Sequence, residues 1–345
     1  WRWRNAVSRR LAIIALVAAF GCGKKSASSG PSAEITGLAA IPASAEVVIG
    51  IDVQRVLDAP LVDHAVDLLL QRDPTLAERW EKLHASCKLD PKQFSHVALA
   101  IGPHQGAQPG TGPVLVVATG KLVETELAAC VRAMVGQGSG GLTASPLGNR
   151  TLYEARDGNR VMYFAFGKAD TVLMSASKDY VTEALGTGKK ISDNPDMQKW
   201  LSMVDQKAPI WAAGRVDDRV RQGLVKTMNG AVTAGPTAIM GSLDLGAGVK
   251  TEIGVLMTSP ADAKALETFV KANIGGLAMA AQAKSLGKLV DAFEITSDGN
   301  RVRFVAALDQ DKVNQLISAL DGGGGSAQSA PPSGSADGSA GSASP

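Results

Sequence analysis

The sequence predicts an α+β fold in which mainly antiparallel sheets carry helices on one face, arranged as two degenerate repeats. Three observations predict this fold: paired apolar runs of strand length, helical patterns that follow these runs, and a pentapeptide that occurs twice. The pentapeptide, Asp-Gly-Asn-Arg-Val, occupies residues 157–161 and 298–302. Because 45% of the residues are hydrophobic, a chain of this length can bury a substantial core.

The first repeat is predicted to span residues 36–205. An apolar run at 46–53 predicts its first strand, and runs at 96–101 and 113–119 predict a strand pair. Ser177 is expected to cap the helix that ends this repeat, since a short polar side chain precedes a helical apolar pattern there.

The second repeat is predicted to span residues 206–321 with the same order of elements. Its first strand is expected at 209–216, and its strand pair at 239–245 and 250–257. Asp309 is expected to cap a terminal helix, because an apolar pattern of helical spacing follows it. The unequal spacing of matched features indicates insertions between the two repeats.

Both copies of the pentapeptide are predicted to form hairpin tips. Residues 152–154 precede the first copy and residues 293–295 precede the second, and each copy leads into alternating apolar positions. Gly and Asn tolerate the backbone angles of tight hairpin turns, so a turn is the expected role of each copy. A binding loop would need further evidence.

A helix is predicted to begin at Ser259, followed by Pro260 at the first helical position and Asp262 in the first turn. The Ala-rich segment 275–292 continues a helical apolar pattern and places Lys284 and Lys288 on the opposite face. Its small side chains would permit close approach of another helix or an acyl chain. The alternative is packing on the protein's own sheet.

Two cysteines, Cys87 and Cys130, each lie on the apolar side of a predicted helix. An even pair of buried cysteines in an oxidising compartment predicts a disulfide, which on the chain-entropy model would stabilise the fold by about 4 kcal/mol. The alternative is two buried free thiols, because cysteine is often buried without pairing.

The chain ends are predicted to lie outside the folded body. Residues 1–21 are predicted to be an export signal peptide, because four arginines precede the apolar run 11–20, which is about half the length needed to span a bilayer. Residues 22–35, rich in Gly, Ser and Lys, are expected to form a flexible tether. Residues 322–345 consist almost wholly of Gly, Ser, Ala and Pro, and are expected to be disordered.

The segment Ala19-Phe20-Gly21-Cys22 resembles the lipobox of bacterial lipoproteins. The resemblance covers the signal alone and implies that Cys22 is acylated and becomes the first residue of the mature protein. Because Gly23 rather than Asp follows, it also implies the periplasmic face of the outer membrane, with membrane lipid as a partner. The alternative is an ordinary secretory signal in which Cys22 is incidental.

The charge balance argues against nucleic acid as a partner. The chain has 35 basic and 33 acidic side chains, and removal of residues 1–21 leaves 31 basic side chains. Nucleic-acid binding needs a concentrated basic face, which this near-neutral body lacks. Aromatic residues make up 4% of the chain, so stacking platforms for bases are not expected either.

The histidines and the acidic pairs are interpreted as structural or solvated. His64, His84, His96 and His104 lie in one stretch, but no pair has the spacing of a zinc site; His84 with Cys87 is the nearest approach. Two acidic pairs are interpreted in the same way. Asp217 and Asp218 lie at a predicted helix start, where negative charge is favourable, and Asp63 and Asp67 lie on a solvated helix face.

Two glycine-rich segments resemble parts of catalytic motifs but lack the required residues. The segment 186–190 resembles the end of a phosphate loop, yet Glu183 replaces its first glycine and Lys190 its Ser/Thr, so a helix C-cap is expected. Ser139 lacks the context of a nucleophile elbow. No catalytic, cofactor-binding or metal-binding residue is therefore predicted, and the protein is not expected to be an enzyme.

These observations predict a membrane-anchored envelope lipoprotein whose non-catalytic periplasmic body has an interaction or structural role. An envelope protein is the expected partner, besides membrane lipid held through Cys22. The alternative is a carrier that holds an apolar ligand or lipid between its sheet and helices, because Ala, Val and Leu supply most of the interior.

Overall fold

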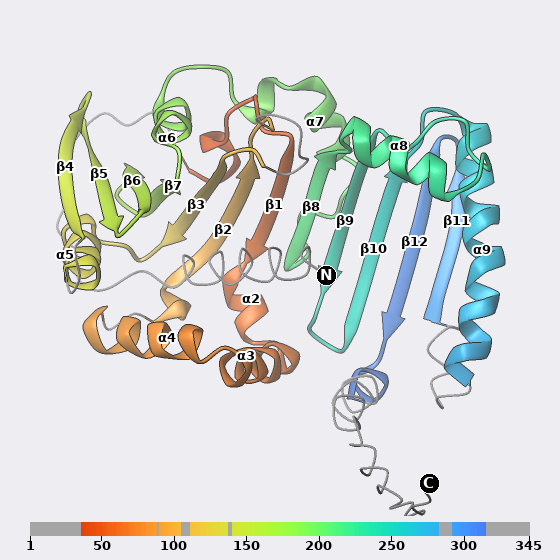
Figure 1. Cartoon of the computed structure of the whole chain (residues 1–345), viewed down its shortest axis with the longest axis horizontal. Helices are drawn as coiled ribbons and strands as arrows, with labels where there is room; N and C mark the ends of the chain where they lie inside the picture. The colour runs from red at the N-terminus through yellow and green to blue at the C-terminus, as the bar shows by residue number, and fades with distance from the viewer. Residues whose placement is uncertain (1–35, 88–89, 105–110, 137–139, 283–291, 315–345) are drawn as a thin grey trace, which may run out of the picture.

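The computed structural model describes residues 36–87, 90–104, 111–136, 140–282 and 292–314 (Figure 1). These residues contain twelve strands. In chain order they are β1 (Val47–Asp52), β2 (Phe94–Ile101), β3 (Val114–Gly120), β4 (Gly141–Leu147), β5 (Arg150–Asp157), β6 (Arg160–Lys168), β7 (Thr171–Ser175), β8 (Ile210–Arg215), β9 (Ala238–Asp244), β10 (Val249–Leu256), β11 (Phe293–Asp298) and β12 (Arg301–Leu308).

All twelve strands belong to one sheet, in the order β11-β12-β10-β9-β8-β1-β2-β3-β7-β6-β5-β4. Every neighbouring pair is antiparallel. The predicted α+β class with antiparallel pairing is therefore confirmed, and the strands join into a single sheet. The apolar runs predicted as β1, β2, β3, β8, β9 and β10 form strands within one or two residues of the expected bounds.

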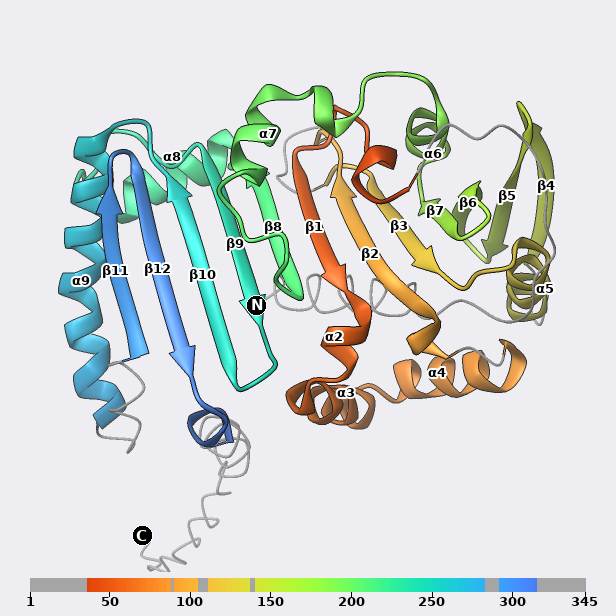
Figure 2. The same ribbon diagram turned by 180° about the vertical axis from the view of Figure 1, so that it is seen from behind.

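The helices lie between the strands in the sequence and cover parts of both sheet faces (Figures 1 and 2). Among the described residues they are α2 (Val53–Leu57), α3 (Pro60–Arg72), α4 (Pro74–Cys87), α5 (Glu124–Val135), α6 (Lys178–Leu185), α7 (Pro195–Leu201), α8 (Asp218–Thr227) and α9 (Pro260–Gln282), with short 3-10 turns at η1 (Gly37–Ala40), η2 (Pro91–Gln93) and η3 (Ile191–Asp193). Residues 310–314 are also helical, and the predicted cap Asp309 accepts a hydrogen bond from the backbone N–H of Lys312.

The predicted helix starts are present. The Ser177 side chain accepts a hydrogen bond from the backbone N–H of Tyr180 at the start of α6. The Ser259 hydroxyl accepts one from the N–H of Asp262 at the start of α9. Helix α9 runs on through Gly275 to Gln282, so the first part of the Ala-rich segment 275–292 belongs to it. Residues 283–291 lie outside the described residues.

The prediction that helices cover one face is wrong. Leu115 packs in a core with α6 and α7, whereas its neighbour Val116 packs in a core with α5. Successive residues of a strand point to opposite faces, so these two cores lie on opposite sides of the sheet. We call the side of the sheet on which α6 and α7 pack the α7 face. Figure 2 shows both helices.

The opposite side, which we call the α9 face, can be followed across the sheet by register. Residues directly opposite each other on paired strands point to the same face. One such row reads, from β11 to β3, Ile295, Phe304, Ile253, Gly241, Ala212, Ile49, Leu99 and Val116. Helix α5 covers the β3 end of this row, and α9 covers the β11 and β12 end.

The two halves of the chain meet at the β1–β8 pair, which we call the seam. Ile49 faces Ala212 there. Reading outward from the seam, the order is β1, β2, β3 in one direction and β8, β9, β10 in the other, so both halves begin alike. Beyond that point they differ. The strand that follows the pentapeptide turn is β12 in the second half, where it lies next to β10, and β6 in the first half, where β7 separates it from β3. The boundary between 205 and 206 stays a prediction.

Both pentapeptide copies form the predicted hairpin tips, and a third tip of the same kind connects β4 to β5. In all three turns Gly comes first and Asn second: Gly148 (φ +61°), Gly158 (φ +58°) and Gly299 (φ +53°). Positive φ at the first central position defines a type II′ hairpin turn, which glycine adopts without steric cost. Local turn chemistry therefore fixes the register of these outer strands.

The predicted disulfide is present: Cys87, the last residue of α4, is bonded to Cys130 in α5, with the two Cα atoms 5.0 Å apart. Both cysteines are buried. The predicted signal (1–21), the tether with Cys22 (22–35) and the tail (322–345) lie outside the described residues. No helix in the part of the chain that the structure describes is long and apolar enough to cross a membrane.

Candidate apolar docking face and its polar rim

The central part of the α9 face is apolar and only partly covered, with Val220 of α8 near one end and the core of α2 and α5 beside Ile49. We use the name open face for seven residues of β1, β8, β9 and β10 that point to this side of the sheet. They are Val47, Ile49, Ala212, Gly214, Ile239, Gly241 and Ile253. Ile239 is 42% exposed and Ile253 is 41% exposed, although both lie in strands at the middle of the sheet. Large apolar side chains exposed together mark binding surfaces.

Small residues hollow the open face at the seam. Ala212 and Gly214 lie on β8 between larger neighbours, and Val47 contacts the space where a side chain at Gly214 would be. A cavity of about 330 Å³ opens here, and Val220 of α8 forms part of its wall. The lining is mostly apolar, which suits a hydrophobic group rather than an ion.

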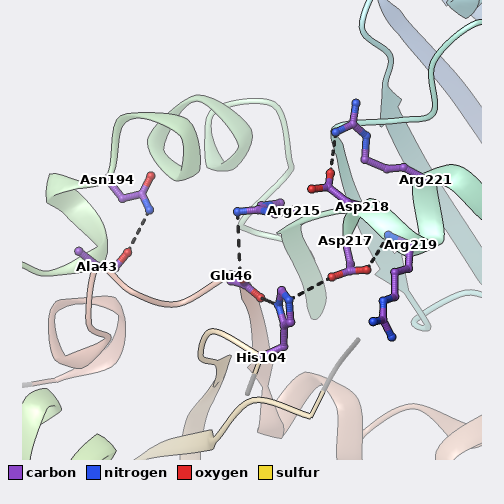
Figure 3. A network of polar contacts seen from close by, with 9 residues as sticks. All are labelled: Ala43, Glu46, His104, Asn194, Arg215, Asp217, Asp218, Arg219 and Arg221. Atoms are coloured by element: carbon purple, nitrogen blue, oxygen red, sulfur yellow. Dashed lines mark hydrogen bonds and ion pairs between the residues drawn. The ribbon is translucent and has the colours of Figure 1, made fainter. Parts of the chain in front are cut away.

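Glu46, His104 and Asp217 are among the residues that line this cavity, and we call these three side chains the rim. Figure 3 shows the contacts between them. His104 Nδ1 lies 3.3 Å from Glu46 Oε2, and His104 Nε2 lies 3.5 Å from Asp217 Oδ2. Glu46 precedes β1 and Asp217 follows β8, so the seam brings together acids from the two halves of the chain. A protonated imidazole can donate a hydrogen bond to each acid, whereas a neutral one donates only one.

Asp217 also has a structural task. Its Oδ1 accepts a hydrogen bond of 2.8 Å from the backbone N–H of Arg219 and so caps helix α8. The sequence predicted this role, because negative charge is favourable at a helix start. The other oxygen of the same carboxylate faces His104. The capping hydrogen bond therefore fixes the position of the Asp217 carboxylate beside His104.

The rim has a small excess of negative charge when His104 is neutral. Arg215 Nη1 lies 4.0 Å from Glu46 Oε1, so a cation faces one of the two carboxylates. Near the opposite end of β9, the Arg55 guanidinium lies 3.3 Å from the Asp244 carboxylate. Within the described residues, no group of three or more His, Cys, Asp or Glu side chains is placed to hold a metal ion.

The other predicted surface residues are dispersed. His64, Asp63 and Asp67 lie on exposed positions of α3. His96 is exposed on β2 and lines a second hollow, of about 320 Å³, on the α7 face. The side chain of His84 and the whole of Ser139 lie outside the described residues.

The segment 186–190 is a helix end, as predicted. Gly186 follows α6 directly, and Lys190 Nζ donates a hydrogen bond of 2.7 Å to the carbonyl of Ala184 in its last turn. Burial lowers the pKa of Lys190 below its usual range. A lysine used in this way caps the carbonyl end of a helix and does not face a phosphate site.

No local sequence pattern predicts that Glu46, His104 and Asp217 lie together. Taken singly, His104 is predicted to be a surface residue and Asp217 a helix cap. They meet only because β1 pairs with β8, a contact between residues far apart in the sequence. One hint was available: two carboxylates and one histidine lie next to predicted strand ends, where loops converge.

No protein family model matches the chain, and no curated protein matches it. Among solved structures, crystal form I of TP0453 is similar in fold with a TM-score of 0.45 and 10% sequence identity. The matched region covers 84% of this chain and 99% of that chain.

Proposed function

We propose that this protein is a lipid-anchored, non-catalytic component of a bacterial envelope whose body binds an amphipathic helix of a partner protein on the open face. The observation that supports the proposal is the apolar strip over β1, β8, β9 and β10, with Ile239 and Ile253 about two-fifths exposed. Anchoring through Cys22 is part of the proposal and rests on the lipobox-like segment.

The dimensions of the open face favour one helix. Four adjacent strands span three strand spacings, about 14 Å, and six residues of β8 extend about 20 Å. An α-helix is about 10 to 12 Å wide with its side chains. The resulting patch of about 280 Å² is far below the roughly 800 Å² per partner of a typical protein–protein interface. A single docked helix therefore fits better than a second whole subunit.

A carrier of an apolar ligand is the second candidate, and the cavity of about 330 Å³ beside the seam is the observation that favours it. This volume is at the lower end of the range for ligand sites, about 300 to 1,000 Å³. A bound ligand usually has most of its surface buried, whereas Ile239 and Ile253 lie on an open strip. The helix proposal is preferred for this reason.

Photocrosslinking in intact cells tests the proposal. The full chain would carry p-benzoylphenylalanine in place of Ile239 or Ile253, and in place of Lys264 as a control, since the Lys264 side chain is 70% exposed on α9. Both open-face positions are expected to crosslink to one segment of one protein, at residues three or four apart, because that spacing identifies a single helix face. Lys264 is expected not to capture it.

Two results would contradict the helix proposal. Crosslinks from Ile239 that carry only the mass of a lipid would support the carrier instead. Crosslinks that are no stronger than those from Lys264 would remove the open face as a binding site altogether. As a further control, Ile253→Lys is expected to reduce crosslinking from position 239 several-fold, because a charge would enter the apolar strip.

A further inference from the structure

The two edge strands of the sheet differ in charge. Edge strands offer unpaired backbone groups, and proteins usually guard them with charged side chains, proline or a covering element. The β11 edge carries Glu294 and Asp298, and α9 packs beside it. Helix α5 likewise contacts the β4 edge, but β4 has no charged residue; Pro146 is its one guarding residue, and residues 143–146 are all exposed. Figure 1 shows these strands at opposite ends of the molecule.

The pairing of β4 with β5 identifies the free backbone groups. Leu147 and Arg150 flank a two-residue turn and therefore exchange hydrogen bonds with each other. Pairs then alternate along the ladder, so the N–H and C=O of Leu142 and Ala144 point away from β5. Pro146 is at the next outward position, where the missing N–H costs no bond within the sheet.

We infer that β4 binds the β4 strand of a second copy of this chain, in antiparallel register about a two-fold axis at Thr143. In this register Leu142 of each copy lies opposite Ala144 of the other, and the two pairs form four backbone hydrogen bonds. The same residues serve on both sides, as a two-fold interface requires. The inference rests on β4 alone and is independent of the open face.

Pro146 favours this register over its neighbour. Shifting the strands so that Ala144 lies opposite Ala144 would place Pro146 opposite Leu142, and two carbonyl groups would then lack a donor. The register about Thr143 leaves Pro146 outside the bonded pairs. Because four hydrogen bonds over a short strip make a weak contact, the test has to capture it covalently.

Cysteine crosslinking of the full chain in intact cells tests this interface. In the inferred register the two Thr143 residues form a non-hydrogen-bonded pair with Cα atoms about 4.5 Å apart, which is within disulfide range. Thr143→Cys is expected to give a disulfide-linked dimer on mild oxidation, read on a non-reducing gel. Thr296→Cys is the matched control: it is an exposed threonine on the opposite edge strand, and its dimer band is expected to be several-fold weaker.

Charge pairs introduced beside Thr143→Cys test the register. Adding Leu142→Lys with Ala144→Lys places lysine opposite lysine and is expected to abolish the dimer band. Adding Leu142→Lys with Ala144→Glu places opposite charges together and is expected to restore it. Both charge variants carry Leu142→Lys and lose the same core contact, so equal thermal unfolding midpoints in the two would show that they fold alike. Folded Thr143→Cys protein that stays monomeric, or crosslinks no better than Thr296→Cys, would overturn the inference, as would equal bands from the two charge variants.

Discussion

Glu267 of helix α9 accepts three hydrogen bonds, one of which connects the helix to the edge strand β11. Its carboxylate accepts one from Lys264 Nζ at 2.8 Å, one from Lys271 Nζ at 2.6 Å, and one from the Ser297 hydroxyl of β11. These donors, with Lys264 and Lys271 contributing most, lower the pKa of Glu267 from 4.5 to about 2. A carboxylate held ionised in this way contributes stability only while it is deprotonated.

The first prediction concerns the pH dependence of this contact. Because the folded pKa lies below the unfolded one, the stabilisation is fully present above about pH 4.5 and is lost as the pH falls towards 2. We expect Glu267→Gln to have a lower free energy of unfolding than the parent at pH 7, and the two curves to converge near pH 2. Urea unfolding at several pH values measures this.

Glu294→Gln is the control for that experiment, because it removes an exposed carboxylate from β11 without touching the Glu267 contacts. A Glu267→Gln variant whose deficit stayed constant between pH 7 and pH 2 would show that its effect is steric rather than electrostatic.

At the scale of elements, the disulfide joins α4 to α5 across a sequence separation of 43 residues. The paired helices lie beside the first half of the sheet, where α5 also contacts β4 and β5. Closing a loop of this length restricts the unfolded chain, which on the chain-entropy model stabilises the folded state by about 4 kcal/mol. The bridge therefore supports the part of the sheet that ends in β4.

The second prediction is that replacing both cysteines, Cys87→Ser with Cys130→Ser, lowers the free energy of unfolding by about 2 to 4 kcal/mol. The lower end allows for residual structure in the unfolded chain. Chemical denaturation of the variant and of the parent, with and without reductant, measures the effect. The parent should respond to reductant and the variant should not; an equal response in both would place the effect outside this bridge.

Elements whose causes are local could be predicted from the sequence. The Ser177 and Ser259 caps, the hairpin tips and the helices of Cys87 and Cys130 depend on neighbouring residues, and all are present. The joining of both halves into one sheet depends on β1 pairing with β8, for which no local pattern exists. The coverage of both faces was missed for the same reason, because strand periodicity does not show which face a distant helix will cover.

At the scale of the whole molecule, the seam makes one packing unit of the two halves. The core of the α7 face contains Val48 and Leu115 from the first half together with Ala213 and Met240 from the second. It also contains Trp200 of α7, near the end of the first half in sequence. Neither half can expose its side of the seam without opening this shared core.

The third prediction follows from that shared core: the described body unfolds in a single cooperative transition. Calorimetry of the full chain is expected to show one peak whose calorimetric and van't Hoff enthalpies agree. Tryptophan fluorescence and far-ultraviolet circular dichroism should report the same midpoint. Two resolved peaks, or midpoints that differ between the two probes, would show that the halves unfold separately despite the seam.

The central position of the seam also has an evolutionary consequence. New hairpins can be added at the outer ends of the sheet, as the additional strands beyond β3 illustrate, without moving the β1–β8 pair or the rim formed by Glu46, His104 and Asp217. Proteins descended from this architecture would then differ in the number of outer strands while keeping the β1–β8 pair unchanged. Loss or gain of peripheral strands would be tolerated in such a lineage, whereas a change at the midline would be eliminated by selection.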